Sequence, residues 1–361
     1  MSERNILIVA GEKSGEEHAK SFLPELMKAR PDLKFFGVGG SYFESLGVEL
    51  LFRLKNFQAM GFSDVIFKIP FFLKAMNQLI KESESKKIQE AILIDFQTFN
   101  LKLAQKLSSK GVKVFYYVAP QAWAWKEHRV KALEKSVEHL FCILPFEQKW
   151  FKDKGVNFVS SVEHPLVEKD RRKIESSSTV NILFLPGSRN SEVKFLLPVM
   201  SEVASYFKGE RYNLILVKAS VVDEKNYFGA ERVFDEILFS EEIDIAFSKA
   251  NFAVAASGTV TLECGLWKIP TVVCYKLSLL NELIATTFIS YKGYASLVNI
   301  ILEKEIFPEL LLEECSPIQI KKKLDQLFLN YSEIQKELEN LNKKMKSGNQ
   351  SALSLLLEKI K

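Results

Sequence analysis

The chain has 361 residues, enough for two domains of ordinary size that each bury a core. Hydrophobic residues make up 47% and charged residues 26%, which excludes a disordered chain and is typical of a globular protein. The 49 Lys and Arg residues nearly balance the 45 Asp and Glu residues, and the net charge of +4 argues against a nucleic-acid-binding protein.

The first half of the chain, residues 1–167, alternates short apolar runs with helical stretches. The apolar runs predict buried strands at Asn5–Ala10, Lys34–Val38, Glu90–Asp95, Lys113–Val118 and His139–Leu144. Helices are predicted between them at about 16–29, 98–110 and 126–136. Continuous apolar strands separated by helices are typical of a parallel sheet that is covered on both faces.

A second series of the same kind occupies residues 180–344, after a charged, serine-rich linker at Arg171–Thr179. Strands are predicted at Asn181–Leu185, Asn213–Lys218, Phe252–Ala256 and Pro270–Tyr275, with helices at about 192–207 and 261–266. Two such series predict an α/β protein of two Rossmann-like, doubly wound domains that face each other across a cleft. The tail from Pro317 is predicted to be helical. Its last part, about 345–361, is expected to pack back on the first domain or on a partner chain in a homodimer.

A glycine-containing turn, Gly11-Glu12-Lys13-Ser14-Gly15-Glu16, follows the first predicted strand and opens a helix. Glycines allow a tight turn, and a helix N-terminus offers free amides to an anion or a hydroxyl group. Glu12, Ser14 and Gly15 are therefore candidate substrate contacts, and an ordinary strand–helix turn is the alternative interpretation. The dinucleotide fingerprint G-x-G-x-x-G is absent, which disfavours a nicotinamide dehydrogenase, and no cofactor is predicted.

Asp95 ends a predicted strand, and Asn100 follows within the next helix. Ligands of doubly wound sheets bind at the carboxyl ends of the strands, where a partly desolvated carboxylate can act as a general base. Asp95 is therefore a candidate catalytic residue and Asn100 a candidate substrate contact. A helix N-cap is the alternative interpretation of Asp95.

Two tryptophans follow another strand end, in the segment Tyr117–Trp125. Exposed tryptophans are costly, and one that lies beside a ligand site can stack on a sugar ring. Trp123 is the candidate residue, and a buried aromatic plug is the alternative interpretation.

The segment Leu185–Arg189 predicts a strand that runs into a turn with an arginine at its end. A guanidinium group is permanently charged and forks towards oxyanions, so it suits a diphosphate. Ser188 is a candidate substrate contact, and Arg189 is a candidate catalytic residue that stabilises a leaving group. A surface arginine is the alternative interpretation.

The segment Ala255–Glu263 leads from a strand of small residues into a helix N-terminus. The amides of Ser257, Gly258 and Thr259 are placed to hold a diphosphate without side-chain charge. Glu263, one turn into the helix, is a candidate acceptor for both ribose hydroxyls. The chain contains no Asp-x-Asp pair, so no metal is predicted at the leaving group.

These motifs resemble those of the lipid-A-disaccharide synthases, which are glycosyltransferases of the two-Rossmann-domain GT-B type. The resemblance is carried by residues 11–16, 60–65, 94–100, 117–125, 164–166, 185–193, 256–263, 270–276 and 297–311. It covers nearly the whole chain, in order and at consistent spacing.

The resemblance implies an inverting transfer from a UDP-2,3-diacylglucosamine donor to a 2,3-diacylglucosamine 1-phosphate acceptor, giving the lipid A disaccharide 1-phosphate and UDP. It also implies that Asp95 is the base, that Arg189 contacts the diphosphate and that Asn299 lies near the UDP. The N-terminal domain would bind acceptor and membrane, and the C-terminal domain the UDP-sugar. A UDP-sugar 2-epimerase and a non-catalytic UDP-sugar- or membrane-binding module are the alternatives.

Three segments depart from the family pattern. Gln97-Thr98 stands where the family usually has Pro-Asp, Glu163 where it has Gly, and Ser41-Tyr42-Phe43 where it has Pro-Arg-Met. All three belong to the predicted acceptor domain, so differences from the family are expected in acyl-chain length or acceptor identity.

A basic, apolar segment at Val65–Lys81 contains no acidic residue. Large apolar side chains beside lysines suit the headgroup region of an anionic bilayer, and the candidate membrane residues are Phe67, Lys68, Phe71, Phe72 and Lys74. A core helix with lysines at its edge is the alternative interpretation. No stretch approaches the roughly 20 apolar residues of a membrane span.

The four cysteines, Cys142, Cys264, Cys274 and Cys315, form no Cys-x-x-Cys pair, which indicates reduced thiols. Reduced thiols are typical of a cytoplasmic protein. Together with the segment Val65–Lys81, the resemblance implies that the protein is peripherally associated with the inner membrane.

Overall fold

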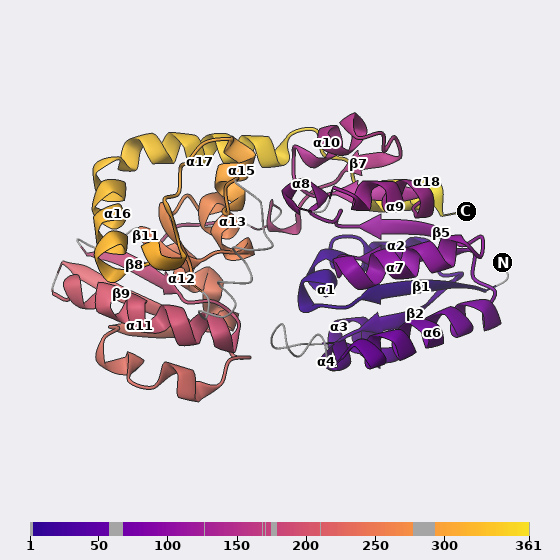
Figure 1. Ribbon diagram of the computed structural model, residues 1–361, viewed down its shortest axis with the longest axis horizontal. Helices are drawn as coiled ribbons and strands as arrows, with labels where there is room; N and C mark the ends of the chain where they lie inside the picture. Colours follow the sequence, from indigo (N-terminus) through magenta and orange to yellow (C-terminus); the bar gives the residue numbers. More distant parts are fainter. Residues whose placement is uncertain are drawn as a thin grey trace. The chain divides into compact units, whose positions relative to one another are not determined.

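Both halves of the chain form a parallel β-sheet with helices on its two faces (Figure 1). The computed structural model describes residues 3–57, 68–125, 127–167, 169, 171–174, 179–209, 211–276 and 293–360. The chain divides into two compact units, Met1–Glu168 together with Met345–Lys361, and Lys169–Lys344. We call these the N-terminal unit and the C-terminal unit.

The sheet of the N-terminal unit has seven strands in the order β3-β2-β1-β4-β5-β6-β7, and every neighbouring pair is parallel. The strands are β1 (Arg4–Ala10), β2 (Leu33–Gly39), β3 (Glu49–Arg53), β4 (Glu90–Ile94), β5 (Lys113–Tyr117), β6 (His139–Cys142) and β7 (Val159–Ser161). The order reverses between β1 and β4, which is the point where doubly wound sheets bind their ligands.

The helices of this unit are α1 (Lys13–Ala19), α2 (Leu23–Ala29), α3 (Ser41–Ser45), α4 (Leu54–Phe57), α6 (Ile69–Ser85), α7 (Gln97–Ser108), α8 (Ala122–Trp125), α9 (Arg129–Ser136), α10 (Glu147–Asp153) and α18 (Ala352–Lys359), with a 3₁₀ turn η1 (Pro165–Val167). The single helix predicted at about 16–29 is wrong, because the chain forms α1 and α2 there. Pro24 explains the break: proline is tolerated in the first turn of a helix but not in its interior, and Pro24 lies in the first turn of α2.

Strand β1 lies at the centre of the core and is buried on both faces. Leu7 and Val9 contribute to one cluster, with side chains from α6 and α7, whereas Ile6 and Ile8 contribute to the other, with side chains from α1, α2 and α18. This alternation follows from the two-residue period of a strand. The core therefore fixes the position of the loop that leaves β1.

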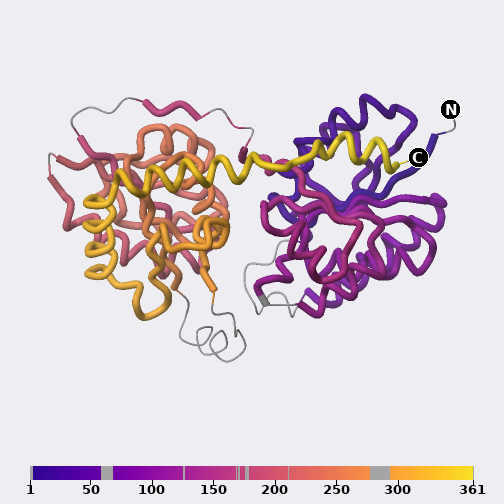
Figure 2. Tube along the Cα trace, turned by 90° about the horizontal axis from the view of Figure 1, so that it is seen from above, coloured from indigo at the N-terminus to yellow at the C-terminus, as the bar shows by residue number. Residues whose placement is uncertain are grey.

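The last helix, α18, belongs to the N-terminal unit, and Figure 2 shows the end of the chain lying against that unit. Leu356 is fully buried in the same cluster as Phe22 and Leu26 of the α2 region. Arg30 donates a hydrogen bond of 2.8 Å to the carbonyl of Ile360. The tail therefore packs on its own N-terminal unit.

The sheet of the C-terminal unit has six parallel strands in the order β10-β9-β8-β11-β12-β13. They are β8 (Val180–Leu185), β9 (Tyr212–Lys218), β10 (Glu236–Phe239), β11 (Phe252–Ala256), β12 (Thr271–Tyr275) and β13 (Glu309–Leu311). In chain order this is 3-2-1-4-5-6, the Rossmann order, and the reversal falls between β8 and β11. The predicted pair of Rossmann-like, doubly wound domains is confirmed.

The helices of the C-terminal unit are α11 (Asn190–Tyr206), α12 (Ile243–Lys249), α13 (Thr259–Leu266), α15 (Leu297–Leu302), α16 (Pro317–Leu329) and α17 (Tyr331–Lys346), whose last two residues lie past the unit boundary. Short 3₁₀ turns lie at η2 (Glu224–Tyr227), η3 (Ala230–Arg232), η4 (Ser240–Glu242) and η5 (Leu312–Glu314). Within the described ranges, no helix is long and apolar enough to span a bilayer.

Candidate active site

In the N-terminal unit, the two predicted motifs meet where the strand order reverses. Ala10 and Ile94 are paired at the ends of β1 and β4, so the loop that starts at Gly11 and the residue Asp95 leave the sheet side by side. The Ser14 hydroxyl donates a hydrogen bond of 3.3 Å to the Asp95 carboxylate. The fold therefore brings the predicted Glu12–Ser14 segment and the predicted catalytic carboxylate together.

The Asp95 carboxyl group is partly buried, and this burial is the main cause that raises its pKa to about 6. The negative charge of Glu12 raises the pKa further, whereas the hydrogen bond from Ser14 lowers it. A carboxylate whose pKa approaches neutrality accepts a proton more readily than an ordinary surface aspartate, which suits general-base chemistry.

The backbone at the carboxyl ends of β4 and β5 is strained. Asp95, Phe96 and Val118 have φ angles of 49°, 48° and 67°, in the left-handed region. Aspartate tolerates this region, but a β-branched valine does so rarely, and such residues cost about 1–3 kcal/mol each. Three strained residues at the same edge of the sheet indicate that this geometry is maintained for function.

Asn100 supports this backbone. Its side chain is fully buried, and its Nδ2 donates hydrogen bonds to the carbonyls of Ile94 (3.1 Å) and Asp95 (2.9 Å). The Tyr116 hydroxyl donates to the same Asp95 carbonyl at 3.2 Å. Asn100 therefore positions the backbone of Asp95, and its predicted contact with substrate stays a prediction. Tyr116 was missed, because a tyrosine within an apolar strand gives no signal of such a contact.

The glycines of the first loop are explained by packing. A Cβ atom on Gly11 would collide with the ring of Phe96, and one on Gly15 would lie 3.1 Å from the Cβ of Ala10. Gly15 is buried and allows close packing of α1 on β1, whereas Glu12 and Ser14 are exposed. The predicted substrate contacts of these three residues stay predictions.

Glu16, the last residue of the same motif, has a structural role. It is buried, and its Oε1 accepts hydrogen bonds from the amides of Gly40 (2.7 Å) and Phe43 (3.0 Å). These amides belong to the start of α3, so Glu16 joins the first loop to the turn after β2.

Trp123 is held in place by a buried carboxyl group. Its Nε1 donates a hydrogen bond of 3.0 Å to Glu147, and its ring packs edge-on against Phe146 at 5.1 Å. Burial raises the pKa of Glu147 to about 7. This arrangement fixes the orientation of the indole, and the predicted stacking of Trp123 on a sugar ring stays a prediction.

In the C-terminal unit, Arg189 follows β8 and Ser257 follows β11, on neighbouring strands paired at Leu185 and Ala255. The Arg189 side chain is 67% exposed and contacts Glu192 at 2.5 Å. Glu192 also accepts a hydrogen bond of 3.0 Å from the amide of Ser188. Gly187 has a φ angle of 112° and approaches Glu192 closely, which requires glycine. Glu192 thus shapes the loop that presents Ser188 and Arg189.

The second loop, Ser257–Thr259, opens the eight-residue helix α13. The Ser257 amide donates to the Cys274 carbonyl at 2.8 Å, and the Thr261 hydroxyl donates to the Gly258 carbonyl at 2.8 Å. A Cβ atom on Gly258 would meet nothing within 4 Å, so the loop faces open space. The first amides of a helix have no partner within it, and α13 begins beside β11, where the strand order reverses.

Glu263 lies one turn into α13, and its side chain is only 13% exposed. Its Oε1 accepts a hydrogen bond of 2.7 Å from the Nζ of Lys169. This contact could not be predicted from the sequence, because Lys169 lies 94 residues from Glu263 along the chain.

Asn299 is fully buried, and both ends of its amide are engaged within the protein. Its Nδ2 donates to Glu309 and to the Phe307 carbonyl, and its Oδ1 accepts from the amides of Ile306 and Phe307, at 2.7 to 2.9 Å. Asn299 organises the turn between α15 and β13. Its position near the UDP, which the resemblance implies, stays a prediction.

The predicted membrane segment is only partly exposed. Phe71 and Phe72 pack their rings against Phe57 at 5.3 and 5.8 Å, and the cluster continues to Phe96 beside Asp95. These two phenylalanines are partly buried and pack against the core, and their assignment as membrane residues stays a prediction. On α6 the exposed apolar side chains are Ile69 (48%) and Leu73 (54%), with Lys68 and Lys74 beside them. Phe67 lies outside the described residues.

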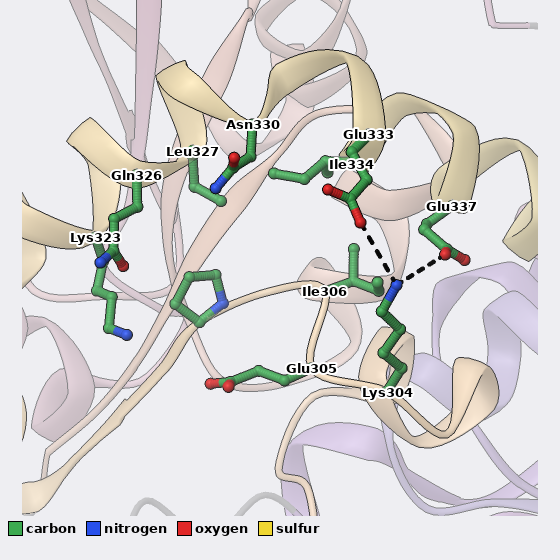
Figure 3. A pocket seen from close by; sticks show the side chains of 11 residues that line it. Lys304, Glu305, Ile306, Lys323, Gln326, Leu327, Asn330, Glu333, Ile334 and Glu337 are labelled. Carbon is green, nitrogen blue, oxygen red and sulfur yellow. Dashed lines mark hydrogen bonds and ion pairs between the residues drawn. The ribbon is translucent and has the colours of Figure 1, made fainter.

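A cavity of about 240 Å³ lies in the C-terminal unit between the turn after α15 and helices α16 and α17 (Figure 3). At its rim Lys304 forms ion pairs with Glu337 (3.0 Å) and Glu333 (3.9 Å). None of the predicted site residues lines this cavity. The described ranges also contain no cluster of three His, Cys, Asp or Glu side chains arranged to hold a metal ion.

The two Rossmann-like units define a protein of the GT-B fold class. The glycosyltransferase of kitacinnamycin has the same fold, with a TM-score of 0.65, 11% identity and 99% coverage of both chains. The UDP-GlcNAc 2-epimerase of Neisseria meningitidis gives a TM-score of 0.57 at 10% identity, covering 100% of this chain and 99% of that one. At such identities these likenesses establish the fold alone.

The sequence comparisons are more specific. The model of the lipid-A-disaccharide synthetase family matches residues 6–360. The lipid-A-disaccharide synthase of Myxococcus xanthus (strain DK1622) is 35% identical over 339 residues, covering 90% of this chain and 88% of that protein. The chain belongs to the lipid-A-disaccharide synthase family. The predicted resemblance is thereby confirmed, and the protein is a glycosyltransferase of lipid A biosynthesis.

Proposed function

We propose that the protein transfers diacylglucosamine from UDP-2,3-diacylglucosamine to the 6-hydroxyl of 2,3-diacylglucosamine 1-phosphate, with release of UDP. The N-terminal unit binds the acceptor and the C-terminal unit binds the UDP-sugar. The observation that carries the proposal is Asp95, a partly buried carboxylate with a raised pKa, held on strained backbone where the strand order reverses.

Asp95 acts as the general base. It takes the proton of the acceptor's 6-hydroxyl while that oxygen attacks the anomeric carbon of the donor. One displacement inverts the anomeric configuration from α to β. Ser14 orients the carboxylate, and Asn100 and Tyr116 hold the backbone that carries it.

The loops of the C-terminal unit stabilise the departing UDP. Negative charge grows on the diphosphate as the glycosidic bond breaks, and the Arg189 guanidinium with the amides of Gly258 and Thr259 offsets it. Glu192 holds the Arg189 loop in shape, and Glu263 accepts hydrogen bonds from the ribose hydroxyls.

The reaction is tested directly with both lipid substrates in mixed micelles. We expect UDP and disaccharide to appear in equal amounts, because one displacement forms one of each. Product is followed by mass spectrometry of the lipid and an enzyme-coupled assay for UDP, in parallel with and without EDTA. UDP formed without acceptor would indicate hydrolysis, and no disaccharide with any acyl-chain length would contradict the proposal.

A UDP-sugar 2-epimerase is the second candidate, because solved epimerases share the fold. Such an enzyme needs no lipid surface. Conversion of UDP-N-acetylglucosamine to its 2-epimer without detergent or acceptor would favour it over the glycosyltransferase.

We further propose that the protein binds the cytoplasmic face of the inner membrane through the start of α6. Ile69 and Leu73 are exposed there beside Lys68 and Lys74, a combination that suits anionic headgroups. The acyl chains of both proposed substrates would then lie close to the acceptor-binding unit.

Replacing Ile69 and Leu73 together with Ser is expected to weaken partition into anionic vesicles roughly thirtyfold, because each apolar side chain contributes on the order of 1 kcal/mol when buried in lipid. Co-sedimentation with vesicles measures the effect, and calorimetry should show unchanged UDP affinity. Ile318→Ser, at an exposed isoleucine of α16, is the control. Equal partition of all three proteins would contradict the proposal.

A further inference from the structure

The Glu263 carboxylate is held by a lysine from outside its own helix. The Nζ of Lys169 lies 2.7 Å from Oε1 of Glu263 and 3.3 Å from Oδ1 of Asp244. The Glu263 side chain is 13% exposed and that of Asp244 is 60% exposed, so water screens the second contact far more than the first. Lys169 is therefore chiefly the counter-ion of Glu263.

The segment that carries Lys169 is fixed to the C-terminal unit at its other end. The Nζ of Lys173 donates to the carbonyls of Phe247 (3.1 Å) and Ala250 at the end of α12. The amide of Ile174 donates to the Ser248 carbonyl at 3.0 Å. These contacts anchor the segment along α12, so the lysine is presented to Glu263 from a defined position.

A partly buried carboxylate needs a compensating charge to remain ionised in one orientation. With Oε1 engaged by Lys169, the carboxylate presents Oε2 as an acceptor of fixed direction. A hydrogen bond between a neutral hydroxyl and an ionised carboxylate is strong and directional.

We infer that Lys169 is a positioning residue for ribose recognition, which orients the Glu263 carboxylate so that its other oxygen accepts the ribose hydroxyls. The inference rests on the proposed role of Glu263 and extends it to a residue of the interdomain segment. Lys169 itself touches no substrate.

We expect the loss of Lys169 to lower binding affinity only for ligands that carry the ribose hydroxyls. In the full-length protein, Lys169→Met should weaken UDP binding roughly tenfold, because a charge-assisted hydrogen bond is disturbed. Binding of 2′,3′-dideoxy-UDP should change less than about twofold, and Lys169→Arg should recover most of the UDP affinity. Isothermal titration calorimetry measures both ligands. In the transfer assay the donor KM should rise while kcat stays within about twofold.

Lys268→Met is the matched control, since Lys268 forms a 3.0 Å ion pair with Glu339 in the same unit. It should leave the affinities for both ligands unchanged. If Lys169→Met weakens UDP and dideoxy-UDP equally, the lysine is merely structural and the inference is overturned.

Glu263→Gln tests the proposed ribose contact of Glu263 separately from the positioning role of Lys169. If it abolishes the preference for UDP over dideoxy-UDP while Lys169→Met does not, the inference about Lys169 fails and the role of Glu263 stands. If Glu263→Gln leaves the preference intact, the ribose contact itself is wrong and the inference falls with it.

Discussion

Replacing Asp95 with Asn is expected to lower kcat by about 10²- to 10⁴-fold while UDP affinity changes less than about twofold. Asparagine has nearly the same shape and keeps an oxygen that accepts from Ser14, but it cannot take a proton from the acceptor. Single-turnover release of UDP measures the loss, and calorimetry measures binding. Retained turnover would remove Asp95 from the role of base.

The pH dependence gives an independent check on the same residue. Because the base must be ionised, kcat/KM of the wild-type enzyme should fall as the pH drops through about 6. Ser14 lowers the pKa of Asp95 and Glu12 raises it. Ser14→Ala should therefore move the acidic limb to higher pH, and Glu12→Gln should move it to lower pH. Shifts in the same direction would contradict this account.

The stability of the Asn variant distinguishes lost chemistry from lost folding. The pKa of Asp95 in the folded protein lies above its unfolded value of about 3.9. The contribution of Asp95 to the free energy of unfolding is therefore fully present below about pH 4 and is lost as the pH rises through about 6. At pH 7.5 the variant lacks this unfavourable charge. Its melting temperature should be at least that of the wild type.

Replacing Arg189 with Ala is expected to lower kcat/KM by about 10²- to 10³-fold, as for the loss of one group that stabilises an oxyanion. Lysine should restore only part of the rate, because it lacks the planar fork that engages two phosphate oxygens. The same UDP-release assay measures the series at varied donor concentration.

Arg232→Ala is the matched control for Arg189, because Arg232 is an equally exposed arginine of the same unit in η3. Glu192→Gln is expected to have an intermediate effect, since it weakens the contact that shapes the loop without removing the guanidinium. Equal rates for Arg189→Ala and Arg232→Ala would exclude a role at the diphosphate.

The sequence predicts the sheets and the loops well because both rest on local chemistry. An apolar run such as Ile6–Ala10 can only be a buried strand when a glycine turn and a helix follow it. Residues at the carboxyl end of such a strand must then lie at the edge of the sheet. For this reason the structure places Asp95 beside Ser14, and Arg189 on the strand next to that of Ser257.

The sequence does not tell which polar side chains turn towards a ligand and which turn towards the protein. Asn100 and Asn299 occupy motif positions, yet both are fully buried and hold backbone. Trp123 is engaged by Glu147, which lies 24 residues away. Such contacts depend on tertiary packing, which neither residue type nor spacing specifies.

The same limit applies to apolar residues. Periodicity shows that α6 has an apolar stripe, but Phe71 and Phe72 face inwards only because Phe52 and Phe57 come from elsewhere in the chain to meet them. The exposed large apolar side chains of α6 are instead Ile69 and Leu73.

The packing of α18 on the N-terminal unit has a consequence for how the protein is made. Residues 345–360 leave the ribosome only after the whole of the C-terminal unit has been synthesised, yet Leu356 and Ile360 complete the cluster around α2. The first unit to be synthesised therefore stays open on one face, with Phe22 and Leu26 uncovered, until the second has emerged. The core of the N-terminal unit is therefore completed late in folding, by contacts between segments far apart in the chain. The hydrogen bond from Arg30 to Ile360, for example, joins residues 330 positions apart.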